Sequence, residues 1–183
     1  MLDGEERFIQ AATEGESSAF GELYDHYQPK IYRFVLVKVS RREDAEDLTH
    51  QVFLNAWQNI ATYRSRGFPF SSWLYRIARN VVVDHYRAKK PEFSVEDLDP
   101  EGVAGMENHE SQAEHSLGWE KVMSALRQLP AQYQEVILLR FVEELSVRET
   151  AAAIKKSEGA TKVLQHRAIQ HLRELLPLTD LPE

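Results

Sequence analysis

Residues 146–176, SVRETAAAIKKSEGATKVLQHRAIQHLRELL, decide the fold of the C-terminal part of the chain. Ser146 and Glu149 have the spacing of a capping box, and the small apolar residues after them predict a short helix over about 147–154. A polar turn follows. Beyond it, apolar residues at three- and four-residue steps predict a longer amphipathic helix over about 158–176, with Ser157 as its N-cap. This arrangement is a helix-turn-helix, whose second helix has the size of the DNA major groove.

The outer face of this second helix is polar and cationic. A helical wheel places the apolar side chains in one sector, namely Ala160, Leu164, Ala168, Leu172 and Leu175. The opposite sector and the turn supply the candidate contacts to duplex DNA, which are Lys155, Lys156, Ser157, Glu158, Lys162, Gln165, His166, Arg167 and Arg173. An exposed helix with ordinary solvated charges is the alternative interpretation, because helical hairpins are common in proteins.

Upstream of this unit, two more helices are predicted over about 117–129 and 132–142, with a break at Leu129-Pro130. Before them, residues 91–116 contain prolines and glycines, no Lys or Arg, and no sustained periodicity. This composition predicts a flexible acidic linker. The formal net charge of −7 is concentrated here, since residues 91–118 carry eight acidic side chains and no basic one. The charge outside this segment is therefore nearly balanced, and local basic patches can occur within the flanking units.

The N-terminal half also has the spacing of helices. Ser40 and Glu43 form a second candidate capping box before an amphipathic helix of about five turns. A less regular helix over about 20–35 precedes it, with a bend expected at Pro29, and another helix follows over about 71–89. The predicted fold class is all-α, with two small helical domains, 1–90 and 117–183, joined by the linker 91–116.

The region from residue 63 to residue 90 combines cations with aromatic side chains. The helix expected over 71–89 has an apolar sector and, nearly opposite, a sector with Arg76, Asn80 and Arg87. Unpaired bases stack on aromatic rings while cations hold the nucleic-acid backbone. The composition is therefore typical of a site for single-stranded or melting DNA. For Trp73 and Tyr75, burial in the core is an equally open interpretation.

The composition argues against several other classes of protein. The 183 residues contain no cysteine, which excludes disulfides and thiolate metal sites and fits a reducing cytosol. The N-terminus lacks a secretory signal, and no apolar run approaches the roughly 20 residues of a membrane span, so we expect a cytoplasmic protein. The histidines show no metal-ligand spacing, and no nucleophile motif is present. We therefore expect no metal, no cofactor and no enzymatic activity.

Several strings resemble sigma factors of the extracytoplasmic-function (ECF) group in the sigma-70 superfamily. They are residues 42–48 (REDAEDL), 52–57 (VFLNAW), 73–80 (WLYRIARN), 126–130 (LRQLP), 136–140 (VILLR) and 166–168 (HRA). The resemblance covers most of residues 17–176 and rests on the order and spacing of these strings. It implies a dissociable subunit that binds core bacterial RNA polymerase and promoter DNA, and it makes an anti-sigma protein a candidate partner.

The resemblance also assigns roles by position. The residues that it implies for binding the polymerase clamp are Asp44, Glu46, Asp47, Leu48, Gln51 and Asn55. The residues implied for capture of the non-template strand of the minus-ten element are Arg64, Arg66, Phe68, Trp73, Arg76, Arg79, Asn80, Asp84 and Arg87. The face from Lys155 to Arg173 would read the minus-thirty-five element as a duplex. The linker would run towards the RNA exit path of the polymerase.

The chain departs from this family at two places. His50-Gln51 stands where relatives commonly carry an acidic residue and glutamine, and Thr161-Lys-Val-Leu164 replaces an Arg-containing string. The base preference of the last helix therefore cannot be taken from relatives. Two other hypotheses stay open, a stand-alone helix-turn-helix regulator with an N-terminal sensing or dimerisation domain, and a helical enzyme that uses its histidines and carboxylates.

Overall fold

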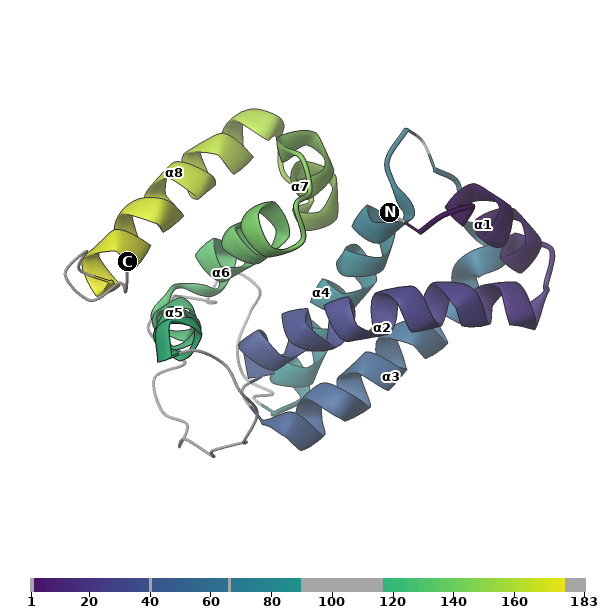
Figure 1. Ribbon diagram of the computed structural model, residues 1–183, viewed down its shortest axis with the longest axis horizontal. Helices are drawn as coiled ribbons and strands as arrows, with labels where there is room; N and C mark the ends of the chain where they lie inside the picture. Colours follow the sequence, from purple (N-terminus) through teal and green to yellow (C-terminus); the bar gives the residue numbers. More distant parts are fainter. Residues whose placement is uncertain (1, 40, 66, 90–116, 177–183) are drawn as a thin grey trace.

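The computed structural model describes residues 2–39, 41–65, 67–89 and 117–176. Its elements are α1 (Glu5–Thr13), α2 (Ser17–Val39), α3 (Arg42–Asn59), η1 (Ile60–Thr62), α4 (Phe70–Lys89), α5 (Leu117–Gln128), α6 (Ala131–Ile137), the π-helical turn η4 (Leu138–Val142), α7 (Val147–Ile154) and α8 (Glu158–Leu175). Every regular element of the described residues is helical (Figure 1), which confirms the all-α fold class. The predicted linker over 91–116, Ser40 and Arg66 lie outside the described residues.

The N-terminal unit, α1 to α4, is built around apolar stripes with helical spacing. In α2, Leu23, Ile31 and Phe34 are each at most 1% exposed, and in α3 Val52 and Ala56 have no exposed surface. These stripes meet because α2 packs on α3, and α4 packs on both. The helix α2 is continuous through the position where the sequence predicted a bend.

The helix α1 was not predicted from the sequence, and it is fixed by a buried polar contact. Gly4 precedes it with φ of 71°, a left-handed conformation that suits glycine. Glu5 is buried at the start of the helix, and its carboxylate accepts a hydrogen bond from the hydroxyl of Tyr27 in α2. Burial, together with this carboxylate, raises the pKa of the Tyr27 hydroxyl above its ordinary value. The contact ties the N-terminal segment to the core of the unit.

Of the two predicted capping boxes, only the one at α7 lies within the described residues. Arg41 occupies the N-cap position of α3 without a side-chain cap hydrogen bond, and Ser40 lies outside the described residues, so the box there stays a prediction. Acidic side chains in the first turn of α3 instead lie where the helix dipole favours negative charge. The box at α7 is confirmed, because the Ser146 hydroxyl accepts from the Glu149 amide at 3.2 Å and the Ser146 amide donates to the Glu149 carboxylate at 2.7 Å.

The helix-turn-helix is confirmed as the pair α7 and α8. Lys155 ends α7 with φ of 56°, which turns the chain sharply, and the Ser157 hydroxyl then caps α8 by accepting from the Ala160 amide at 3.2 Å. The buried stripe of α8 is centred on Thr161 and Ala168, which have no exposed surface. Ala160 and Leu175 are exposed, so their predicted place in the core sector is wrong, whereas Ala168 is buried and Leu164 and Leu172 are partly buried as predicted. The buried stripe includes Thr161, which the predicted sector left out.

Removing the Ser146 cap should destabilise the C-terminal unit. Ser146→Ala leaves the first amides of α7 without the hydroxyl acceptor, which costs about 1 kcal/mol of unfolding free energy. We expect the thermal midpoint to fall by about 2–4 °C in a circular-dichroism melt. Ser146→Thr keeps the hydroxyl and should melt within about one degree of the parent. Equal melting of the alanine and threonine variants would show that the box contributes nothing.

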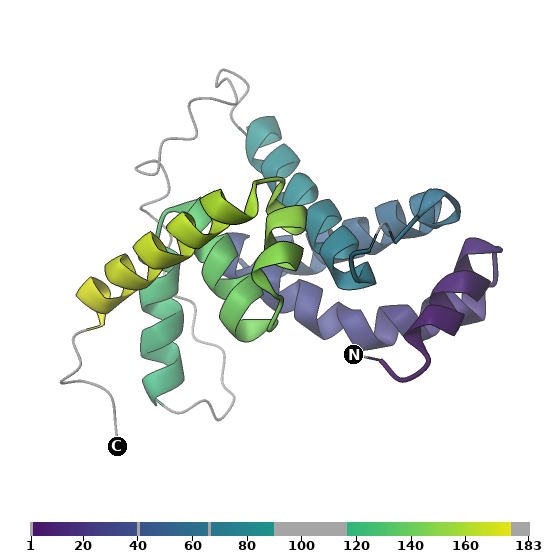
Figure 2. The same ribbon diagram turned by 90° about the horizontal axis from the view of Figure 1, so that it is seen from above.

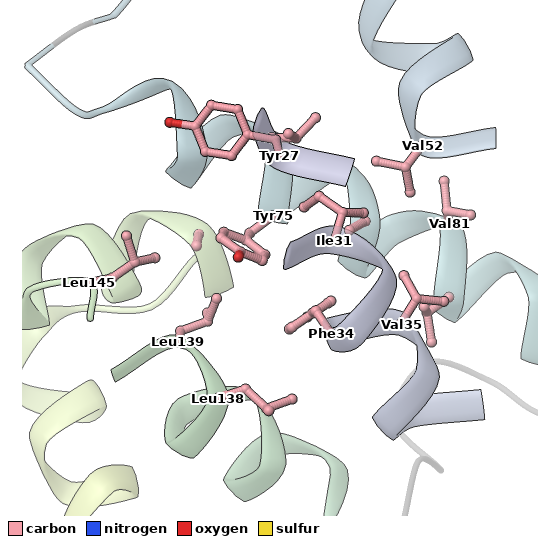
Figure 3. Packing of buried hydrophobic residues seen from close by; sticks show 14 of the residues in the cluster. Tyr27, Ile31, Phe34, Val35, Val52, Tyr75, Val81, Leu138, Leu139 and Leu145 are labelled. Carbon is pink, nitrogen blue, oxygen red and sulfur yellow. The ribbon is translucent and has the colours of Figure 1, made fainter. Parts of the chain in front are cut away.

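The two helical units share one core. In both views α7 lies beside the first turns of α4 (Figures 1 and 2), and the buried apolar cluster continues from one unit into the other. Tyr75 of α4 stands at the centre of this contact, with Ile31 and Phe34 on one side and Leu139 and Leu145 on the other (Figure 3). It is 1% exposed, so the open question about Tyr75 is resolved in favour of the core.

Candidate nucleic-acid interface

The predicted polymerase-binding residues all lie on α3 but on two of its sides. An open hollow of about 330 Å³ between α3 and α4 is lined by Leu48, Gln51, Asn55, Val81, Asp84 and His85. Asp44 reaches the same side, since its carboxylate lies 3.8 Å from Nε2 of His85. Glu46 faces the other side of α3, where it accepts from Arg42 at 2.9 Å, and Asp47 is exposed. The structure therefore groups five of the six residues near one face and separates Glu46.

The same helix exposes an apolar residue that the sequence analysis did not single out. Leu54 is 49% exposed, and it follows Asp47 and Gln51 at helical steps of four and three residues. A large apolar side chain among polar ones on a solvent-facing stripe was visible in the sequence as a break in the amphipathic pattern. It has the surroundings of a protein-contact residue, which is an apolar centre inside a polar rim.

The predicted strand-binding region is built on a cluster of aromatic rings at the start of α4. The rings of Tyr63, Phe70 and Trp73 contact one another with centroids 5.0 to 5.4 Å apart. Phe70 is 1% exposed, whereas Trp73 is only partly buried and keeps part of its ring surface free. Burial raises the pKa of the Tyr63 hydroxyl above its ordinary value, so this ring stays neutral.

The loop before α4 presents Phe68 and Arg64 beside this cluster. Gly67 has φ of 77°, so the loop reverses at a position that favours glycine. Arg64 is exposed and donates to the backbone carbonyls of Ala61 and Tyr63 at 3.2 and 2.7 Å. Phe68 is partly buried beneath the guanidinium of Arg148, which lies 5.1 Å from the centroid of its ring.

Most polar residues of α4 face solvent, and one pairs with the C-terminal unit. Asn80, Asp84 and Arg87 are exposed and Arg76 is partly exposed, with Arg87 lying 3.5 Å from the Asp84 carboxylate. Arg79 points to the C-terminal unit instead, where its Nε lies 3.2 Å from the Glu135 carboxylate. The predicted cationic face of α4 is therefore exposed at 80, 84 and 87 and partly exposed at 76 and 79, with Arg79 held in an ion pair with the C-terminal unit.

The predicted duplex-binding residues form a continuous open surface on α8 and the turn before it. Eight of the nine are exposed, which are Lys155, Lys156, Ser157, Glu158, Lys162, His166, Arg167 and Arg173. Gln165 is partly buried because its side-chain oxygen accepts from Nε of Arg140 at 2.9 Å. Since a guanidinium only donates, this contact leaves the amide NH₂ of Gln165 as its outward donor. Val163, 51% exposed among these residues, is an apolar member that the sequence analysis missed.

The residues that the structure describes contain neither a membrane-spanning helix nor a cluster of metal-ligating side chains. No helix among them is long and apolar enough to cross a membrane. Within the same ranges, no group of three or more His, Asp or Glu side chains is close enough to hold a metal ion.

Comparison with protein families finds two matches in chain order. The family model for Sigma-70 region 2 matches residues 23–92, and the model for Sigma-70, region 4 matches residues 119–172. The first covers most of the N-terminal unit, and the second covers α5 to α8 almost to its end.

Relatives of known family agree with these matches. The chain is 41% identical over 172 residues to the ECF RNA polymerase sigma factor BldN of Streptomyces coelicolor, covering 92% of this chain and 64% of that protein. It is 30% identical over 178 residues to SigW of Bacillus subtilis, covering 92% and 94%. This chain thus spans nearly all of SigW and somewhat less than two thirds of BldN.

Solved structures show the same likeness. The sigma factor RpoE of Bartonella quintana, in complex with the anti-sigma factor NepR, superposes with a TM-score of 0.72 at 27% identity, covering 87% of this chain and 97% of that one. CnrH, in complex with the cytosolic domain of CnrY, gives 0.70 at 25% identity, covering 95% and 97%. From its two region matches and its relatives, this chain belongs to the sigma-70 family of RNA polymerase sigma factors, in the ECF group.

Proposed function

We propose that this protein binds core bacterial RNA polymerase, recognises the minus-thirty-five and minus-ten promoter elements, and promotes DNA melting for transcription initiation. The observation that supports the proposal is that the two matched regions carry two chemically different surfaces, each suited to one form of nucleic acid. One combines the aromatic cluster at Trp73 with the cations of α4, and the other is the exposed cationic surface of α8. Stacking surfaces suit unpaired bases, whereas an exposed recognition helix suits the duplex major groove.

The individual roles follow from this division. The open face of α3 with its hollow would contact the polymerase clamp, and residues 64–87 would hold the non-template strand. The helix α8 would read duplex DNA, with the Gln165 amide donating to a base acceptor and Val163 placed for a thymine methyl group. The proposed domains are 1–90, 91–116 and 117–183. This function places the protein in the cytoplasm and makes it an initiation factor and not an enzyme.

An anti-sigma protein is a proposed further partner. Two related structures, RpoE and CnrH, were solved with NepR and with the cytosolic domain of CnrY, and the first of these partners is an anti-sigma factor. A partner of this kind would control access to the polymerase-binding and DNA-binding faces.

Reconstitution with core polymerase tests the proposed function. The purified chain should co-elute with core enzyme from a related bacterium in size-exclusion chromatography and should direct transcription from a cognate promoter. The core enzyme alone and the core enzyme with heat-denatured chain serve as controls. Failure to form a complex with a suitable core enzyme would refute the sigma-factor function.

Changing the exposed cations of α8 should weaken upstream recognition. Lys162→Ala with Arg173→Ala removes two positive charges from the duplex-binding face and should lower the affinity of the holoenzyme for the minus-thirty-five region about 10-fold or more at moderate salt. The plot of the logarithm of affinity against the logarithm of salt concentration should become less steep by about two units, which corresponds to the loss of two phosphate contacts. DNase footprinting across a salt series measures both quantities. An unchanged upstream footprint would contradict the assignment of this face.

A further inference from the structure

The outward donor of Gln165 is set by a side chain that lies outside the exposed face of α8. Arg140, in η4, donates from Nε to the side-chain oxygen of Gln165 at 2.9 Å, and its Nη1 donates to the backbone carbonyl of Leu145. Two nitrogens of this guanidinium are therefore occupied by acceptors of the C-terminal unit itself. Because a guanidinium is planar and its donors form a rigid fork, two hydrogen bonds from it fix its orientation.

The backbone that carries Arg140 is held on both sides. Leu138 and Leu139 before it are each 1% exposed, and Leu145 after it is 7% exposed. The amide of Leu145 donates to the carbonyl of Leu139 at 2.9 Å, which closes the turn around Arg140. The helix α6, which runs into η4, packs along α8 (Figures 1 and 2). Arg140 is therefore held in place beside α8 before any DNA is bound.

Gln165 lies at the border between the core side and the open side of α8. At about 100° per residue, it lies about 40° from the buried Thr161 and about 60° from the exposed Lys162. Oxygen and nitrogen stand at different corners of a planar amide, so the NH₂ group is directed away from Arg140. Within the described ranges, no group accepts a hydrogen bond from this NH₂. It is available to a ligand of the open side.

We propose that Arg140 is a positioning residue for sequence recognition, which restricts Gln165 to the role of hydrogen-bond donor and so favours guanine over adenine at one position of the minus-thirty-five duplex. This inference rests on the proposed function. Guanine presents two acceptors, O6 and N7, in the major groove, and they match the two N–H groups of the amide. Adenine presents an acceptor beside a donor, so glutamine pairs with both only when its oxygen turns towards the base. Arg140 holds that oxygen.

Base preference distinguishes this role from a structural one. Holoenzyme formed with the parent chain is used to select promoters from a library randomised over the minus-thirty-five element, and guanine should exceed adenine about 10-fold at one position. Arg140→Met keeps an unbranched side chain but removes the guanidinium, so the Gln165 amide can turn and this ratio should fall to about two-fold or less. A merely structural loss lowers binding to all sequences alike and leaves the ratio unchanged. Arg127→Met, at an exposed arginine of α5, is the matched control and should keep the parent ratio.

A second pair of variants shows whether Arg140 acts through Gln165. Gln165→Leu removes the amide and should abolish the guanine preference at that position. In this background Arg140→Met should change the ratio no further, because residues that act through one contact are not additive. A further shift of the base ratio there would overturn the positioning role.

An isosteric variant of Gln165 tests the donor directly. Gln165→Glu keeps the shape of the side chain and its acceptor for Arg140, but it has no outward donor. This variant should lose guanine and select cytosine, whose N4 amine donates to a carboxylate. It leaves the contacts of Arg140 in place, so it decides the question even where Arg140→Met does not fold. A retained preference for guanine in Gln165→Glu would overturn the inference.

The same selection with the full chain and duplex DNA alone, at low salt, separates this inference from the proposed function. Guanine selected by the free chain and lost in Arg140→Met would uphold the role of Arg140 even without binding of core polymerase, which would refute only the sigma-factor function. Transcription by holoenzyme whose base preferences are unchanged in Arg140→Met would uphold the proposed function and overturn this inference. No selection by either the free chain or the holoenzyme would overturn both.

Discussion

Replacing Arg76 and Arg87 together by alanine is expected to reduce promoter melting on the order of 100-fold while upstream duplex binding stays near the parent level. Arg87 is exposed and Arg76 is partly exposed. Arg87 has only an exposed ion pair with Asp84 at 3.5 Å, which holds it weakly. A hydrogen bond to a charged group contributes about 1.5–3 kcal/mol, so the loss of one at each arginine costs about 3–6 kcal/mol.

The measurement separates melting from binding. Permanganate reactivity of thymines in the minus-ten region reports the open complex, and DNase protection upstream reports duplex binding on the same template. Arg7→Ala with Arg127→Ala is the matched control, because it removes two exposed arginines from α1 and α5, outside the proposed sites. Normal permanganate reactivity in the Arg76, Arg87 variant would show that this face of α4 does not hold the strand.

The helices themselves were predictable from local patterns. The predicted helix over about 158–176 is observed as Glu158–Leu175, and the helix predicted over about 71–89 is observed as Phe70–Lys89. The periodicity there is strong, and the Ser146 and Ser157 caps mark helix starts by a chemistry that depends on neighbouring residues only. At α3 the N-cap is Arg41, one residue after the predicted one, because spacing alone fixes a helix boundary only to within about one or two residues.

The covered face of α4 was not predictable from the sequence. This face consists of Ser72, Tyr75 and Arg79, which follow one another at helical steps of three and four residues. A helical wheel that assigns one side to the core and the opposite side to DNA does not predict that a third side packs on the C-terminal unit. The partner of Arg79 is Glu135, 56 residues away, and nothing local marks that carboxylate as buried. Contacts between distant segments depend on how the units dock, which periodicity does not encode.

The start of the chain illustrates the same limit. Its helix α1 is short, and it is held by the hydrogen bond from Tyr27 to Glu5, which are 22 residues apart. A glutamate near an N-terminus is normally predicted to be exposed to solvent, because charged side chains are rarely fully buried. The burial of Glu5 therefore could not be predicted from the sequence. The exposed Leu54 is a different case, because it lay on the polar side of a predicted amphipathic helix and was overlooked.

Reversing Asp47 and truncating Leu54 on α3 should remove most of the affinity for core polymerase. Both side chains are solvent-exposed and lie on one stripe with Gln51 beside the hollow between α3 and α4. Asp47→Arg reverses the charge at one end of the stripe, and Leu54→Ala removes its apolar centre. Central interface residues cost about 2 kcal/mol or more each when lost, so the dissociation constant should rise on the order of 100- to 1,000-fold.

A matched double variant distinguishes this site from a general loss of charge or apolar surface. Asp25→Arg with Leu175→Ala makes the same chemical changes at exposed positions on α2 and at the end of α8, and it should bind polymerase as the parent does. Fluorescence titration of labelled protein with core enzyme gives the dissociation constant of each double variant, and circular dichroism checks that each variant is folded. Increasing salt should weaken the parent complex more than the Asp47, Leu54 variant, because screening acts on the charge contact that the variant lacks. Equal affinities of the two double variants would place the polymerase contact elsewhere than on this stripe of α3.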